Sequence, residues 1–297
     1  MEEKVSFFSS LLAPAEIFLF LSRSERKMQV LCSTGAFTRS SDPRSHELIL
    51  EYSQEFIADG LENIFYPRWY QEPERIVSAL GSCKLPFPVL HMEKSIGECF
   101  GSNQPAEQEL GVLRFEQNCI FAHQLGIQIV VLHLWEMPSS DMHLEQNLQS
   151  LARCLDLAEQ YRLTLTIETI PCTYADPLSN VQWAVEHDSR ARVALDTEFL
   201  AWHNQLEAVF TASWLWQGKV VRHVHLKDHN GLSNQRKGLN YLHPGEGEID
   251  FRRFVQQLKA AGYDGALSLE ARAIDSEGRV DVKRIQSSLQ FMRQLIS

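Results

Sequence analysis

Six residues of types that bind metal ions each stand at the end of a short apolar run. In chain order they are His91, His133, Glu168, Asp196, His225 and Glu270. If the runs are strands of one barrel, their carboxyl ends meet and the six side chains converge. Clustered carboxylates resist ionisation, and a divalent cation is the simplest way to hold them charged. The pattern predicts one divalent metal ion, Mn²⁺, Co²⁺, Zn²⁺ or Mg²⁺; coincidental polar residues at strand ends are the alternative.

The stretch VVRHVHLKD, residues 220–228, is the most informative of these runs. Alternate residues of a strand point to opposite faces, so His223 and His225 share one face while Val224 and Leu226 share the other. Buried imidazoles need hydrogen-bonding partners, and carboxylates or metal ions are the usual ones. The sequence therefore predicts that this strand turns a polar face toward such a partner. Histidines satisfied within an ordinary core are the alternative.

The apolar runs alternate with helical segments in a pattern typical of a single α/β domain. Eight runs occupy residues 29–35, 61–67, 87–92, 127–134, 163–170, 191–198, 220–228 and 265–272, and the clearest helical segments occupy 144–162 and 251–263. Eight such units in roughly 240 residues match a (β/α)8 TIM barrel. A doubly wound sheet is the alternative, but no GxGxxG follows the first run. We expect a catalytic barrel domain over 28–297, preceded by a helical N-terminal extension over 1–27.

Composition and charge narrow the classes of partner. The formal net charge of −10 disfavours a general affinity for nucleic acid. The six cysteines form neither a CxxC pair nor a zinc-finger spacing, which predicts reduced thiols and a cytoplasmic location. The apolar segment within residues 1–27 is too short, and too interrupted by Glu16, to span a bilayer. We expect no membrane association, and a segment lying on a membrane surface is the alternative. We expect it to dock on the barrel, and it could also form part of an interface in a homo-oligomer.

Several motifs resemble those of one known family. The series HMEK, VVLHLW, TIETIP, ALDTE, HVHLKD, HPGEGEIDF and LSLEAR resembles the xylose-isomerase-like TIM-barrel superfamily, which includes sugar (phosphate) isomerases and epimerases and endonuclease IV. The resemblance covers about residues 28–296. It implies a metal-dependent isomerase or epimerase of carbohydrate metabolism. Its substrate would be a small-molecule sugar, a sugar phosphate or a polyol-derived ketone, changed by proton transfer through an enediolate.

The resemblance also assigns roles to residues. In the ketose epimerase branch a Glu, an Asp, a His and a Glu from the last four strands hold the metal, and these fall here on Glu168, Asp196, His225 and Glu270. Glu168 and Glu270 would then also be the catalytic base and acid. The residues expected to bind substrate are His91, His133, Lys227, Arg236, His243 and Arg272.

Two other functions are open on the sequence. The first is a zinc phosphodiesterase resembling endonuclease IV, because His91 and His133 also match that branch. It is disfavoured by the net charge and by Phe199, which stands where many members carry a histidine. The second is a barrel that binds a ligand without turnover. Deuterium exchange at carbon would separate the isomerase from both, and cleavage of abasic DNA would identify the phosphodiesterase.

Overall fold

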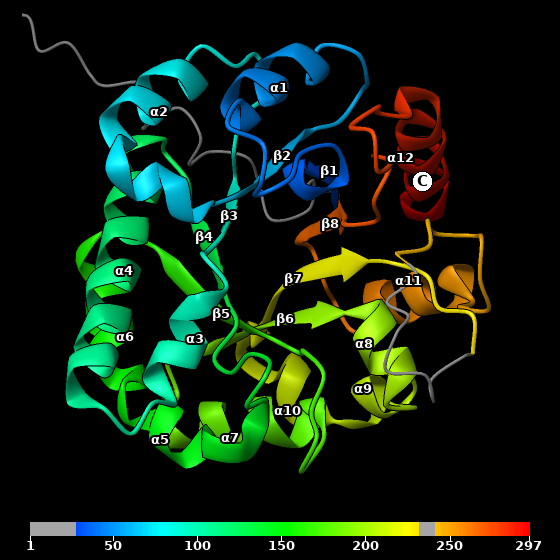
Figure 1. The fold of residues 1–297 in the computed structure, drawn as a ribbon. Coiled ribbons are helices and arrows are strands. Elements are labelled where there is room, and N and C mark those ends of the chain that lie inside the picture. The colour runs from blue at the N-terminus through cyan, green and yellow to red at the C-terminus, as the bar shows by residue number, and fades with distance from the viewer. Residues whose placement is uncertain (1–27, 232–240) are drawn as a thin grey trace, which may run out of the picture.

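Eight parallel strands close into a barrel in the order β1 to β8, which confirms the predicted (β/α)8 fold (Figure 1). The computed structural model describes residues 28–231 and 241–297. The N-terminal extension, residues 1–27, lies outside the described residues, so its expected helix and its docking stay predictions. Within the described ranges, no helix is long and apolar enough to cross a membrane.

Every predicted strand is present, and each is shorter than its apolar run. The strands are β1 (Gln29–Ser33), β2 (Gly60–Ile64), β3 (Val89–His91), β4 (Ile129–Leu132), β5 (Thr164–Glu168), β6 (Arg192–Asp196), β7 (Val221–Leu226) and β8 (Ala266–Leu269). Two of them end at a helix cap. Ser33 accepts the Gly35 N–H and begins η2 (Thr34–Ala36), and Asp196 accepts the Phe199 N–H and begins α8 (Thr197–Trp202). These side chains satisfy N–H groups that have no partner within the helix, so the chain leaves the sheet there.

Helices surround the barrel (Figure 1). The other helices are α1 (Ser45–Tyr52), η3 (Pro67–Gln71), α2 (Pro73–Leu80), α3 (Ser95–Phe100), α4 (Pro105–Gln124), η4 (Asp141–His143), α5 (Leu144–Gln149), α6 (Leu151–Gln160), α7 (Pro177–His187), α9 (Ala208–Thr211), α10 (Ser213–Trp216), η5 (Gln217–Lys219), α11 (Phe251–Ala260) and α12 (Val282–Ile296). The predicted helix 144–162 is divided into α5 and α6, because the Ser150 N–H bonds to Asn147, three residues back rather than four. The predicted helix 251–263 forms α11 and ends before Gly262, whose φ of 78° a glycine adopts without strain.

The barrel interior changes from apolar to polar along the strands. Its apolar layer consists of Leu31, Val89, Val131, Ala194 and Ala266. Two positions further along each segment, and therefore on the same face, stand Ser33, His91, His133, Asp196 and Ser268. The polar residues thus gather toward the carboxyl ends of the strands, which is where TIM barrels carry their chemistry.

Asp141 ties together two loops on the carboxyl side of the barrel. It follows β4, and its carboxylate accepts the backbone N–H groups of Thr173, Tyr174 and Ala175, after β5, at 2.8, 3.0 and 2.8 Å. The side-chain amide of Asn180 donates to it at 3.1 Å. Burial alone would raise the pKa of Asp141, but these hydrogen bonds lower it from 3.8 to about 2.

Replacing Asp141 by asparagine is therefore expected to lower the free energy of unfolding at neutral pH by about 2 kcal/mol, the energy equivalent of that pKa shift. A depressed folded-state pKa contributes stability that is fully present above 3.8 and is lost as the pH falls through about 2. Urea unfolding at neutral pH and near pH 3 measures the difference between the two proteins, which should shrink in acid. An equal difference at both pH values would mean that the carboxylate charge is not responsible. Asp156→Asn, at an exposed ion pair with Arg190, is the control and should change stability by less than about 1 kcal/mol.

Candidate functional site

Four of the predicted residues form one buried cluster. The ligand atoms of Glu168, Asp196, His225 and Glu270 all lie within 4.8 Å of one another. Glu168, Asp196 and His225 belong to β5, β6 and β7, and Glu270 directly follows β8. Their side chains are between 0% and 7% exposed. The barrel thus joins residues that are far apart in the sequence, as the alignment of strand ends predicts.

Backbone hydrogen bonds fix Asp196 within this cluster. Its Oδ1 caps α8 by accepting the Phe199 N–H at 3.1 Å, and its own N–H donates to Thr169 Oγ1 at 2.9 Å. Its Oδ2 is therefore left to face the cluster. Burial, together with the charges of Glu168 and Glu270, raises the pKa of Asp196 to about 7, although Lys227 opposes this rise. Such a carboxylate needs a cation nearby to stay ionised at neutral pH.

Lys227 places its ammonium between two members of the cluster. Its Nζ lies 2.7 Å from Asp196 Oδ2 and 2.7 Å from Glu270 Oε2, and the contact with Asp196 is an ion pair outside hydrogen-bond geometry. The same Nζ lies 4.2 Å from the centre of the Phe199 ring. Burial would lower the pKa of Lys227, but Asp196 and Glu270 raise it well above its ordinary value. The residue expected to contact substrate thus also supplies positive charge to the carboxylates.

His91 and His133 meet the cluster at Glu168. Their Nε2 atoms lie 3.2 and 2.7 Å from Glu168 Oε2, and the ligand atoms of the three residues lie close enough to hold an ion. His133 also bonds to Glu136 through Nδ1. Burial alone would lower the pKa of His133, but Glu168 and Glu136 raise it to about 9. Both ring nitrogens of His133 therefore face carboxylates.

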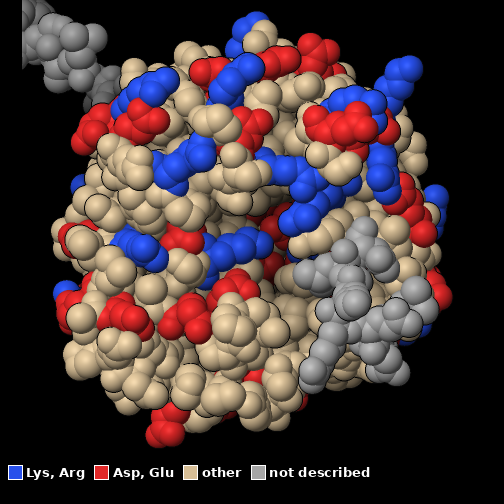
Figure 2. Space-filling view, viewed as in Figure 1, with Lys and Arg blue, Asp and Glu red and all other residues tan. Residues whose placement is uncertain are grey.

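A cavity of about 820 Å³ opens at the carboxyl end of the barrel. Glu270, Lys227 and His133 line it, whereas Glu168, Asp196, His225 and His91 are buried and do not. Figure 2 shows this hollow at the centre of the face, with acidic atoms deep inside and basic side chains on both sides. The basic lining residues besides Lys227 are Arg39, Lys94 and Arg272. None of these three has an acidic partner within ion-pair distance among the residues that the structure describes.

Three other predicted substrate-binding residues lie in different surroundings. Arg272 lines the cavity, and its guanidinium lies 3.9 Å from the centre of the Tyr241 ring. His243 is buried away from the cavity, because its Nδ1 bonds to Ser288 Oγ at 2.6 Å and its Nε2 to the Arg272 carbonyl at 3.1 Å. Neither nitrogen is left for a ligand, so we leave His243 out of the site proposed below. Arg236 lies outside the described residues.

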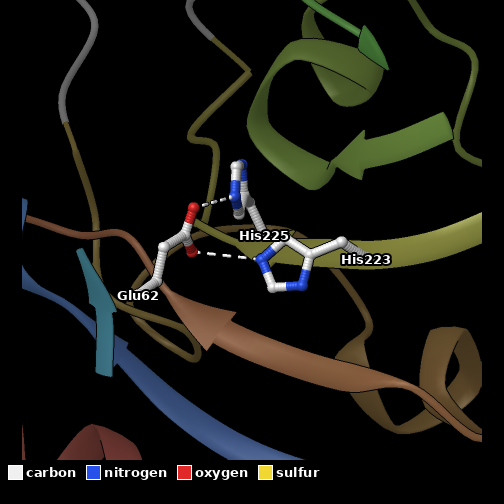
Figure 3. Close-up of side chains that lie close together, drawn as sticks. All are labelled: Glu62, His223 and His225. Atoms are coloured by element: carbon white, nitrogen blue, oxygen red, sulfur yellow. Dashed lines mark hydrogen bonds and ion pairs between the residues drawn. The ribbon is translucent and has the colours of Figure 1, made fainter. Parts of the chain in front are cut away.

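A third group lies in the barrel interior next to the cluster. Glu62, on β2, binds both histidines of β7 (Figure 3). Its Oε2 lies 3.1 Å from His223 Nε2 and its Oε1 lies 2.8 Å from His225 Nε2. This carboxylate is the kind of partner that the polar face of 220–228 requires. The identity of this partner could not be predicted from the sequence, because Glu62 lies 161 residues from His223. The alternation of side chains along a strand does not say which other strand supplies the partner.

A closed parallel barrel with carboxylates and histidines gathered at the carboxyl ends of its strands defines a class, the TIM barrels with a polar active-site rim. Within this class, the chain belongs to the xylose isomerase-like TIM barrel family, because that family's model matches residues 50–295. The match confirms the resemblance that the sequence motifs indicate.

Known proteins similar to the chain include two curated relatives and a solved structure. An uncharacterized protein of Methanocaldococcus jannaschii is 28% identical over 193 residues, which cover 59% of this chain and 63% of that protein. A probable L-ribulose-5-phosphate 3-epimerase of Mycoplasma pneumoniae is 25% identical over 131 residues, 43% of each chain. Both matches span less than two thirds of the relative's length. The crystal structure of D-allulose 3-epimerase from Methylomonas sp. in complex with D-allulose has a TM-score of 0.69 at 15% identity, covering 91% of this chain and 97% of that one; this likeness concerns the fold.

Proposed function

We propose that the protein is a divalent-metal-dependent isomerase or epimerase of a sugar or a related polyol-derived ketone. The observation that carries the proposal is the cluster of Glu168, Asp196, His225 and Glu270 beside a cavity large enough for a small sugar. The names of two similar proteins, a probable ribulose-phosphate epimerase and an allulose epimerase, support the same reaction class.

The donor set fits a divalent cation. Three buried carboxylates and one imidazole place their ligand atoms within 4.8 Å of one another, and mixed oxygen and nitrogen donors suit Mn²⁺, Co²⁺, Zn²⁺ or Mg²⁺. Asp196 Oδ2 faces the cluster and, among the described residues, has an ion-pair partner, Lys227, but no hydrogen bond, so a cation would share it with that ammonium. When bound, the cation would supply Lewis-acid polarisation of a substrate carbonyl and its neighbouring hydroxyl.

The two glutamates would move the proton. Glu270 lines the cavity, and Glu168 lies next to it in the cluster. One glutamate starts ionised, removes a proton from the carbon beside the carbonyl and becomes neutral, while the other starts protonated, gives its proton to carbon and becomes ionised. Return to the opposite face of the same carbon gives an epimer, whereas return to the neighbouring carbon gives an aldose–ketose isomer. His133 lines the cavity with its two ring nitrogens bonded to Glu168 and Glu136, so its proposed part is to hold Glu168 in place beside the substrate.

The cavity mouth favours a substrate with a negative substituent. Arg39, Lys94 and Arg272 line it without ion-pair partners in the described part of the chain, beside the lining carboxylates Glu93, Glu98 and Glu136. Arginine binds phosphate and carboxylate groups in a two-pronged geometry, and lysine adds a point charge. We therefore propose a sugar phosphate ahead of a neutral sugar.

Metal analysis tests the proposal most directly. We expect about one divalent ion per chain after reconstitution, and a clear reduction in the Glu168→Gln variant. At a free metal concentration 100-fold above Kd, the ion should stabilise the wild-type fold by about 2.7 kcal/mol. The loaded protein should then incorporate solvent deuterium into a ketose or a ketose phosphate, and the two substrate panels are compared in the same experiment.

Two results would overturn this proposal. Failure to bind any divalent ion after reconstitution would remove its basis. Two or three zinc ions per chain, together with cleavage of abasic DNA, would instead favour the phosphodiesterase. Deuterium uptake from neutral ketoses alone would refute the preference for a phosphorylated substrate while leaving the reaction class in place.

A further inference from the structure

Glu62 is a buried carboxylate on a strand that is separated by β1 and β8 from the strand of the histidines that it binds. It lies on β2, whereas His223 and His225 lie on β7, and these two strands are not neighbours in the barrel. Its side chain reaches across the interior and places one oxygen on each ring (Figure 3). Glu62, His223 and His225 are all 0% exposed. Burying an ionised carboxylate costs several kcal/mol, and apolar residues can often replace a buried ion pair without loss of stability. The fold alone therefore does not require this glutamate.

His225 joins Glu62 to the proposed metal ligands. Its Nε2 lies 2.8 Å from Glu62 Oε1. Its Nδ1 lies 2.8 Å from Glu168 Oε1, 3.4 Å from Glu270 Oε2 and 3.8 Å from Asp196 Oδ2. A neutral imidazole carries one proton, so it can offer Nδ1 to a cation only when the proton is on Nε2. In that state the Nε2–H needs an acceptor, and Glu62 Oε1 is the acceptor within reach.

His223 holds the other oxygen of the same carboxylate. Its Nε2 lies 3.1 Å from Glu62 Oε2, and its Nδ1 has no hydrogen-bond partner among the residues that the structure describes. Within the described part of the chain, the one hydrogen bond of this ring therefore goes to Glu62. With both oxygens occupied, the Glu62 carboxylate cannot rotate without breaking one of two buried bonds.

We propose that Glu62 is a positioning residue for the metal ligand His225. It keeps the proton of the ring on Nε2, orients Nδ1 toward Glu168, Asp196 and Glu270, and increases the electron density of that nitrogen. The inference rests on the proposed function, because it needs a cation at the cluster. Carboxylates that hold a ligating histidine in this way change metal affinity by about 10- to 100-fold when they are replaced.

The Glu62→Gln variant tests this role. Glutamine has the shape of glutamate but offers one acceptor oxygen in place of two and carries no charge, so His225 or His223 loses its acceptor. We expect the dissociation constant for Mn²⁺ or Zn²⁺, measured by competition with a chromophoric chelator, to rise about 10- to 100-fold. Glu93→Gln is the matched control, because Glu93 is also a buried carboxylate but binds Ser95 and Arg114 rather than His225. Its dissociation constant should stay within about threefold of the wild-type value.

A second measurement does not depend on the stability of any variant. Nitrogen-15 spectra of histidine-labelled wild-type protein loaded with Zn²⁺ should show His225 protonated on Nε2 and bound to metal through Nδ1. A ring bound through Nε2, or a Glu62→Gln protein that folds and binds metal as tightly as the wild type, would overturn the inference and leave the proposed function intact. A wild-type protein that binds no metal would refute the proposed function itself, and this inference with it.

Discussion

Replacing Glu270 by glutamine is expected to slow proton exchange at the substrate carbon by roughly 10²- to 10⁴-fold. The glutamine oxygen can still approach a cation, but the amide cannot accept and return a proton at neutral pH. Glu270 is the carboxylate of the four-residue cluster that lines the cavity, so it is the one placed to meet the substrate. The rate of solvent deuterium incorporation into the substrate measures the effect, with metal content determined on the same sample.

The metal content separates two causes of such a loss. A variant that keeps its ion and loses exchange has lost the proton-transfer group, as we expect. Full exchange in a metal-loaded Glu270→Gln protein would contradict the role proposed for this residue. Glu109→Gln is the control, because Glu109 forms an exposed ion pair with Arg153 and should exchange at the wild-type rate.

Replacing Lys227 by methionine is expected to destabilise the metal-free protein by about 3–5 kcal/mol, the usual cost of removing one partner of a buried ion pair. The Lys227 side chain is 3% exposed, and its ammonium lies 2.7 Å from both Asp196 and Glu270. Without it, the buried carboxylates lose their nearest positive charge. A divalent ion replaces that charge, so most of the lost stability should return when metal is added.

Chemical unfolding with and without Mn²⁺ measures this coupling. Metal should stabilise Lys227→Met more than it stabilises the wild type, because the ammonium no longer offsets the charge of the carboxylates. An equal loss of stability with and without metal would show that Lys227 acts only in packing, for example against Phe199. Lys219→Met, which breaks an exposed pair with Asp264, is the control and should cost less than about 1 kcal/mol.

The fold could be predicted because local signals agree over the described residues from 28 onward. Each apolar run is followed by a helical segment, and the polar residue at the end of a run marks the carboxyl end of a strand. Since all these ends lie on one rim of a barrel, the proximity of Glu168, Asp196, His225 and Glu270 follows without knowledge of any single contact. The strand limits were less accurate, because side chains such as Asp196 begin the next helix at once.

Contacts across the barrel could not be predicted in the same way. Glu62 meets His223 and His225 inside the barrel although β8 and β1 lie between β7 and β2, and no spacing in the sequence encodes that contact. The sequence predicts that Lys227 contacts substrate, but the long side chain also lets its ammonium form ion pairs with Asp196 and Glu270. His243 precedes a tight turn and was expected at the cavity, but Ser288 and the Arg272 carbonyl hold its ring in the protein. Pairings of this kind depend on three-dimensional packing.

The double role of Asp196 limits how such a site can change during evolution. The residue serves the cluster with one oxygen and the first turn of α8 with the other. A lineage that exchanged it for another ligand would also lose a helix cap, at about 0.5–2 kcal/mol. Glu168 and Glu270 cap no helix in the described part of the chain. Descendants that acquire a new metal preference or a new reaction should therefore vary at the glutamates first and retain the aspartate longest.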